Sequence, residues 1–132
     1  MTMDVRDMRV SEGPAVYELL VAEGWSRRIG SFADFTALLA ASQRAVVAVA
    51  QDGRIVGFAR AITDGLSNGY LSMVVVDPAF RRRGVGRALV ERITAGPPTI
   101  TWVLRAGREG AAEFFAACGF TASSIAMERL RE

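Results

Sequence analysis

The stretch GYLSMVVVDPAFRRRGVGRALVER, residues 69–92, decides the fold of this chain. It begins with the apolar run 70–76, whose β-branched residues are typical of a strand buried on both faces. Asp77-Pro78 ends this strand, because proline has no N–H to donate to a sheet. Three arginines and Gly84-Val85-Gly86 come next, and an amphipathic helical pattern follows them. The stretch therefore predicts a strand, a basic glycine-bearing turn and a helix.

The turn has the chemistry of a pyrophosphate site. The first turn of a helix carries unpaired N–H groups and the positive end of the helix dipole. Glycine lets a phosphate approach the backbone, and arginine adds charge-assisted hydrogen bonds. Leu89 stands where a dinucleotide fingerprint needs a third small residue, and a P-loop needs a lysine, which the chain lacks. The pattern therefore indicates a phosphate ligand of another class.

The pattern Arg81-x-x-Gly84-x-Gly86, directly after a Val-Val-Val-Asp-Pro strand end, resembles the acetyl-CoA signature of the GNAT family of N-acetyltransferases. The resemblance covers residues 54–127 and includes Gly119-Phe120. It implies one GNAT-like domain over residues 1–132. That domain is of the α/β class, a mixed sheet with helices on both faces. The alternative is an ordinary strand-to-helix turn whose arginines are only solvated.

The same resemblance implies which residues bind the cofactor, acetyl-CoA. Two neighbouring parallel strands of the fold, here 70–76 and 99–105, splay apart and hold acetyl-CoA in the gap. Backbone groups at the strand end bind the pantetheine arm, and Arg108 stands where the family often has an asparagine. The predicted cofactor-binding positions are Val74, Val75, Val76, Arg81, Arg82, Arg83, Gly84, Val85, Gly86, Arg87 and Arg108.

The catalytic positions depart from the family pattern. Many relatives place a tyrosine, the general acid for the leaving thiolate, four residues before the Gly-Phe pair, where this chain has Phe115. Tyr70 and Met73 stand where two branches of the family place an acidic base. Asp64, Tyr70 and Ser72 are therefore the candidate catalytic residues, ordering a water chain in place of a strong base. The alternatives are a turn role for Asp64 and strand packing for Tyr70.

The absence of a strong base restricts the acceptor. An alkylamine with a pKa near ~10.4 is mostly protonated at neutral pH, whereas an α-amino group near ~7.7–8.0 needs less help. Tyr17, Trp25 and Phe115 are predicted to line an apolar acceptor pocket, with core packing as the alternative. The predicted function is a metal-independent N-acetyltransferase that moves an acetyl group from acetyl-CoA directly to a small-molecule amine. Alternatives are a peptide or protein acetyltransferase, a catalytically silent acetyl-CoA-binding module, and a phosphate-binding interaction domain outside the family.

Composition fits one folded domain and argues against several other classes of protein. The 132 residues are 51% hydrophobic with four prolines, which is typical of a globular domain with a real core. All sixteen basic residues are arginine, against fourteen acids, and the net charge of +2 is too small to predict a nucleic-acid partner. Cys118 is the only cysteine and histidine is absent, so no internal disulfide or Cys/His metal cluster forms.

The sequence shows no pattern that predicts secretion or insertion into a membrane. The first ten residues carry acids and no apolar core of a signal peptide, and no apolar run reaches the length of a membrane span. A single cysteine fits a reducing cytoplasm, which is the predicted location. Cys118 itself is either a proton donor or a packing residue. The resemblance also allows a homodimer, since relatives often form dimers.

Local patterns predict the remaining elements. Apolar periodicity predicts two helices before residue 42, the second capped by Ser31 and Asp34, with a connection at 25–28. Asp52-Gly53 predicts a two-residue hairpin turn. The predicted strands are 4–10, 45–50, 55–63, 99–104 and 125–130, and a last helix covers 109–117.

Overall fold

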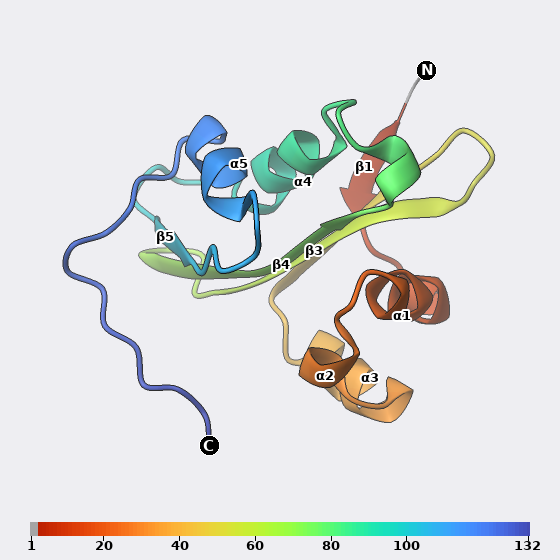
Figure 1. Ribbon diagram of the computed structural model, residues 1–132, viewed down its shortest axis with the longest axis horizontal. Helices are drawn as coiled ribbons and strands as arrows, with labels where there is room; N and C mark the ends of the chain where they lie inside the picture. The colour runs from red at the N-terminus through yellow and green to blue at the C-terminus, as the bar shows by residue number, and fades with distance from the viewer. Residues whose placement is uncertain (1–2) are drawn as a thin grey trace.

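A five-stranded mixed sheet divides the molecule into two helical layers, as Figure 1 shows for the computed structural model, which describes residues 3–132. The strands lie side by side in chain order, antiparallel from the first to the fourth, and the last two are parallel. Their bounds are β1 (Asp4–Asp7), β2 (Arg44–Val49), β3 (Ile55–Thr63), β4 (Asn68–Val76) and β5 (Thr101–Leu104). The predicted α/β class with a mixed sheet is confirmed.

Helices cover both faces of the sheet, as predicted. The first three lie on one face, which we call the α1 face, and the last two lie on the other, the α4 face (Figure 1). Their bounds are α1 (Gly13–Ala22), α2 (Ser26–Ile29), α3 (Phe32–Ala40), α4 (Val85–Ile93) and α5 (Ala111–Ala117), with 3-10 turns η1 (Val10–Glu12) and η2 (Pro78–Phe80). None of these helices has the length and apolarity needed to cross a membrane.

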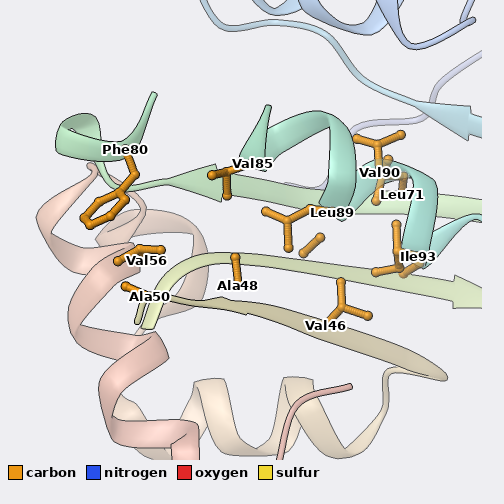
Figure 2. Packing of buried hydrophobic residues seen from close by; sticks show 12 residues of the cluster. Val46, Ala48, Ala50, Val56, Leu71, Phe80, Val85, Leu89, Val90 and Ile93 are labelled. Atoms are coloured by element: carbon orange, nitrogen blue, oxygen red, sulfur yellow. The ribbon is translucent and has the colours of Figure 1, made fainter. Parts of the chain in front are cut away.

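Each face of the sheet has its own apolar core. On the α1 face Phe58 of β3 is fully buried, and its ring centre lies 6.1 Å from that of Phe35 in α3. On the α4 face Leu89 and Ile93 point from the helix onto small sheet residues such as Ala48, as Figure 2 shows. Each large apolar side chain buried in this way stabilises the fold by about 1.5–3 kcal/mol. The sheet is packed between these two cores, which hold its strands in position.

β4 carries a bulge at Ser72. Arg60 of β3 pairs with Met73, while Ala61 pairs with Leu71, so Ser72 has no partner on β3. A bulge locally disrupts the alternation of side chains between the two faces. Leu71 accordingly packs in the core of the α4 face and Met73 in that of the α1 face. The side chain of Ser72 lies beside Arg60, which donates a hydrogen bond to it.

β4 and β5 pair only where β4 begins. Residues 68–71 are in register with 101–104, and β4 then continues through 72–76 without a partner on β5. Gly69 is required here because a Cβ at this position would lie 2.4 Å from the Trp102 ring. The backbone edge 72–76 is therefore free of strand pairing on the β5 side among the described residues. This arrangement agrees with the predicted separation of the two parallel strands.

Three local predictions were wrong. The predicted connection 25–28 contains a short helix, α2, whose C-terminal Gly30 N–H donates to Ser26. The Asp52-Gly53 hairpin has a three-residue loop, because the Gly53 N–H donates to the Ala50 carbonyl and Gly53 is left-handed with φ +88°. A type I turn followed by a left-handed glycine connects two strands in this way.

The third wrong prediction is the final strand at 125–130. Within residues 3–132 this segment pairs with no strand and runs as an extended tail away from the sheet (Figure 1). Ser123 Oγ accepts hydrogen bonds from the N–H groups of Ile125 and Ala126, both at 3.1 Å. A serine that captures neighbouring N–H groups competes with a sheet for the same donors. The tail instead forms an ion pair between Glu128 and Arg105, the residue that follows β5.

Candidate functional site

The turn between β4 and α4 is shaped by its local sequence. Asp77 Oδ1 accepts the Ala79 N–H at 2.9 Å, which starts η2, and Phe80 then anchors the turn in the core of the α4 face. Arg82 and Gly84 follow in the left-handed region, with φ +62° and +77°. A left-handed arginine costs roughly 1–2 kcal/mol, which the surrounding structure has to offset. The turn is therefore held in a defined and partly strained shape.

This shape leaves a row of backbone donors open. Among the described residues, the N–H groups of Arg82, Gly84, Val85, Gly86 and Arg87 have no acceptor. The first N–H groups of any helix lack partners within the helix, and anions bind such groups together with the helix dipole. The donors lie at predicted cofactor positions, so the residues present fit the pyrophosphate of acetyl-CoA.

Two arginine side chains of the turn make contacts near the surface. Arg87 pairs with Glu91 at 3.2 Å, and the Arg83 guanidinium lies 5.3 Å from the centre of the Phe80 ring. Exposed ion pairs are worth about 0–1 kcal/mol, so such contacts are exchanged for a phosphate at small cost. Arg82 is exposed at the tip of the turn. The cluster is thus suited to receiving an anion from solvent.

Gly86 has a packing role that the sequence did not reveal. A Cβ at Gly86 would lie 2.9 Å from the ring of Phe114 in α5 and 3.6 Å from Val76. The first turn of α4 therefore lies directly against α5 and the end of β4. Close contact between helices is a sufficient reason for glycine here, whereas the sequence suggested only close approach of a phosphate. Gly84, which has nothing within 4 Å of an added Cβ, is the glycine that faces open space.

The predicted strand positions lie between the two cores. The Val75 side chain packs in the core of the α1 face, and Val74 and Val76 pack against that of the α4 face. Their side chains are thus structural, and only backbone groups, which alternate along the strand between β3 and the unpaired edge, are available to a ligand at that edge. This division agrees with a role in which the backbone, not the side chain, contacts a ligand.

Two arginines contact the C-terminal end of α1 near Val76, where the unpaired edge of β4 leads into the turn. Arg81 pairs with Glu23 at 2.8 Å, and Arg108 donates to the carbonyls of Glu23 and Gly24 at 3.1 and 3.3 Å. The Arg108 guanidinium also lies 4.0 Å from the centre of the Trp25 ring. Two predicted cofactor residues and one predicted acceptor residue therefore meet at this end.

Asp64 lies in the turn between β3 and β4, with its carboxylate saturated by local donors. It accepts the N–H groups of Leu66 and Ser67 at 2.8 Å and of Asn68 at 3.1 Å, and also the Ser67 hydroxyl. These hydrogen bonds hold the pKa of Asp64 far below its usual value. A carboxylate in this state is a poor proton acceptor at neutral pH. The structure therefore favours the turn role for Asp64.

Two further candidates, Tyr17 and Phe115, pack within the helical layers. The Tyr17 hydroxyl donates to the Gly30 carbonyl at 2.9 Å, and its ring lies 5.4 Å from that of Phe32, so it joins α1 to the segment around α3. Phe115 packs between Phe114 and Phe120, at ring separations of 4.9 and 5.9 Å.

Cys118 ends α5 on the α4 face, half-buried against the core there. Burial is the main cause that raises the pKa of the Cys118 thiol; Glu91 adds to this, while the charge of Arg87 opposes it. A thiol with a raised pKa and apolar neighbours is typical of a packing residue. Of the two interpretations of Cys118, packing is the one that its surroundings support.

A buried cation that the sequence analysis missed lies beside Ser72. Arg60 is only 4% exposed, and it donates to Ser72 Oγ at 2.7 Å and to Ser42 Oγ at 2.8 Å. Arg28 and Tyr70 are its electrostatic neighbours, and burial is the main cause that lowers the pKa of Arg60. The available signal was one arginine between Ala59 and Ala61 inside an apolar strand, a pattern that is equally typical of a solvent-facing position.

Comparison with known proteins agrees with this geometry. The acetyltransferase (GNAT) domain model matches residues 42–122, which include the sheet from β2 onward, the arginine-glycine turn and α5. Comparison with curated proteins gave no match.

Solved structures share the fold over almost the whole chain. A GNAT-family protein from Xanthomonas campestris is 26% identical with a TM-score of 0.78, covering 99% of this chain and 94% of that one. An acetyltransferase from Trypanosoma brucei is 27% identical with a TM-score of 0.70, covering 99% and 100%. Glucosamine-6-phosphate N-acetyltransferase from Arabidopsis thaliana, 19% identical, covers 100% of both chains with a TM-score of 0.73. With the family model matching more than half of its length, this chain belongs to the GNAT family of acetyltransferases.

Proposed function

We propose that the protein transfers an acetyl group from acetyl-CoA directly to the amine of a small molecule. The observation that carries this proposal is the row of open N–H groups from Arg82 to Arg87 at the end of a strand whose edge, 72–76, is unpaired. These are the two surfaces that a pyrophosphate and an extended pantetheine arm require. A single cysteine, half-buried and unpaired, supports the further proposal that the protein works in the cytoplasm.

Binding and orientation supply most of the catalysis in this proposal. The turn holds the pyrophosphate through backbone N–H groups and arginine charge, and the edge of β4 aligns the arm along the sheet. Acetyl-CoA supplies a thioester whose carbonyl carbon the neutral amine attacks. An N–H on the unpaired edge 72–76 stabilises the negative charge that develops on the thioester oxygen. Holding both reactants in place in this way lowers the entropic part of the activation barrier by up to roughly 7–11 kcal/mol.

None of the candidate catalytic positions in residues 3–132 carries a strong acid or base for the proton transfers. Phe115 has no proton to donate, and a thiolate leaves without full protonation because a thiol has a pKa near ~8.5. Tyr70 and Ser72 lie on the same face as Arg60 and are the groups available to order a water near the amine. Such a site works best on amines that are already partly neutral at physiological pH.

Thiol release from acetyl-CoA tests the function. With a panel of amines, weakly basic acceptors are expected to react nearly as fast at pH 7 as at pH 9. Strongly basic ones should speed up about tenfold per pH unit until their own pKa is reached. The assay is the rate of thiol release, with mass spectrometry of the acetylated product. A flat profile at neutral pH for a strongly basic amine would reveal an efficient base, and no release with any amine would favour a silent binding module.

Phe115→Tyr tests whether the missing acid limits the reaction. The ring already lies between Phe114 and Phe120, so the change adds one hydroxyl to an existing ring. If that hydroxyl reaches the sulfur, kcat is expected to rise, by up to about 10²-fold, with little change in acetyl-CoA affinity. Phe120→Tyr, in the same aromatic cluster, is the matched control and should leave kcat unchanged. A loss of stability of about 1–3 kcal/mol without a gain in kcat would instead place Phe115 in the core.

A further inference from the structure

Arg60 is a buried charge without a counter-ion. Its two hydrogen-bond partners, Ser42 and Ser72, are both neutral hydroxyls, and no carboxylate of the described residues contacts it. Its charged neighbour, Arg28, has the same sign. A buried charge is costly unless it is paired, and a hydroxyl compensates less than an anion. Desolvation lowers the pKa of Arg60, which is the expected sign of this unrelieved cost.

Part of the Arg60 guanidinium remains available to a ligand. Its Nε donates to Ser42 and its Nη1 to Ser72, while Nη2 has no partner in the described part of the chain. No fully buried side-chain nitrogen or oxygen there is left without a partner, so Nη2 keeps a small solvent contact although Arg60 as a whole is only 4% exposed. A guanidinium that is fixed on one side and open on the other is preorganised for a carboxylate or a phosphate.

The position of Arg60 places this open donor beside the proposed reaction centre. The bulge brings Ser72 to within 2.7 Å of Arg60, and Ser72 is also the first β4 residue beyond the pairing with β5. Arg60 therefore lies on the α1 face at the point where the unpaired edge 72–76 begins. The proposed pyrophosphate turn is at the other end of that edge. An amine presented from the α1 face would reach the edge with its remaining groups close to Arg60.

Positive charge continues outward from Arg60 on the same side of the molecule. Arg28 on α2 is close enough to Arg60 to lower its pKa, and Arg28 also lines an open hollow next to the C-terminal tail. The single acid of this hollow, Glu128, is already paired with Arg105. The lining residues are Arg28, Arg105, Glu128, Arg129, Leu130 and Arg131. A hollow lined in this way attracts anions and repels cations.

We propose that the acceptor is an amine that also carries an anionic group, a carboxylate or a phosphate, and that Arg60 and Arg28 bind this group. The proposal rests on the proposed acetyl transfer and names the class of its acceptor. Arg60 supplies a fixed charge inside the site, and Arg28 supplies a second, exposed charge at its entrance. A guanidinium serves either anion equally well in geometry, so the two classes are separated by experiment.

The test compares acceptors that differ only in the anionic group. Phosphoethanolamine is compared with ethanolamine, and β-alanine with β-alaninamide, each rate being corrected for the fraction of neutral amine. The wild-type protein is expected to prefer the anionic member by about 10- to 100-fold in kcat/KM, the factor that one charged hydrogen bond provides. The pair with the larger preference identifies the phosphate or the carboxylate.

Three variants assign the preference to the arginines. Arg28→Gln is expected to raise KM for the anionic acceptor about 3- to 10-fold with kcat nearly unchanged, and Arg60→Gln to abolish the preference. Arg60→Lys, which keeps the charge, should restore part of it. Arg27→Gln is the matched control, because Arg27 is an exposed neighbour on the same helix, α2. Should Arg60→Gln fail to fold, Arg28→Gln carries the test alone.

The outcomes separate this inference from the proposed function. Equal kcat/KM for both members of each pair, with product formed, overturns the anionic acceptor and leaves the acetyl transfer standing. A preference that survives in both Arg28→Gln and Arg60→Gln also overturns it. Absence of thiol release with every acceptor contradicts the proposed function itself, and with it the inference. A thermal shift with acetyl-CoA, measured for every variant, shows that each retains the cofactor site.

Discussion

Gly69→Ala is expected to lower the free energy of unfolding by about 1–3 kcal/mol, the usual cost of overpacking. The new Cβ would lie 2.4 Å from the Trp102 ring, which stands opposite Gly69 in the parallel register. The Trp102 ring is also restrained by Arg44, whose guanidinium lies 5.4 Å from the ring centre. Since β5 is joined to β4 over only the register 68–71 with 101–104, the substitution should loosen β5 as a whole. Chemical denaturation measures the loss, and hydrogen exchange of the β5 amides locates it.

The control is Gly107→Ala, at a glycine with an ordinary φ and nothing within 4 Å of an added Cβ. It should change the free energy of unfolding by no more than about 0.5 kcal/mol. Combining Gly69→Ala with Trp102→Ala removes the clash, so the double variant should be more stable than the sum of the single changes predicts. Simple additivity, or an unchanged midpoint for Gly69→Ala, would show that the tryptophan moves aside freely.

Arg82→Glu is expected to remove most of the thermal stabilisation by acetyl-CoA. The change places a carboxylate at the exposed tip of the turn, among N–H groups that have no other acceptor. Charged hydrogen bonds are worth about 1.5–3 kcal/mol, so replacing attraction by repulsion should weaken binding by at least roughly 10- to 100-fold. The measurement is the shift in melting temperature against acetyl-CoA concentration, which reports binding to the native state.

Two further variants separate charge from backbone geometry in this experiment. Arg82→Gly removes the charge but keeps the N–H groups and relieves the left-handed strain at φ +62°. It should therefore bind acetyl-CoA with an affinity between those of the wild type and Arg82→Glu. Arg27→Glu makes the same change of charge on α2, on the opposite face of the sheet (Figure 1), and should bind normally. Wild-type affinity in Arg82→Glu would mean that the phosphates bind elsewhere.

The sequence predicted the elements whose signals are local. The β-branched run before Pro78 and the glycine-bearing turn after it appear in the structure as β4, η2 and α4. The capping box was also predicted correctly, since Ser31 Oγ accepts the Asp34 N–H at 3.1 Å and Asp34 accepts the Ser31 N–H at 3.0 Å. Such features depend on residues three or four positions apart, which a reader of the sequence sees together.

The features that escaped prediction depend on residues far apart in the chain. Gly86 is small because Phe114 of α5 lies against it, and Gly69 is small because of Trp102. Arg60 becomes a buried site residue only because a bulge in the next strand and the end of α3 both meet it. No spacing rule connects these positions. The strand expected at 125–130 fails for the opposite reason, since a nearby serine captures donors that a longer-range pairing would have needed.

The bulge at Ser72 has a consequence for how this protein can change over generations. The partners of β4 continue from Leu71 to Met73 as if Ser72 were absent, so the sheet does not depend on the residue inserted there. Neighbouring strand positions are constrained by the two cores, where a change of one methylene is felt. Position 72 is exempt from that constraint, yet its side chain lies next to Arg60. Strand pairing does not depend on the side chain at position 72, but Arg60 needs a hydrogen-bond acceptor there. Under the proposed function, substitutions that keep such an acceptor, as Ser72→Thr does, would therefore be the ones able to change acceptor specificity without disturbing the fold.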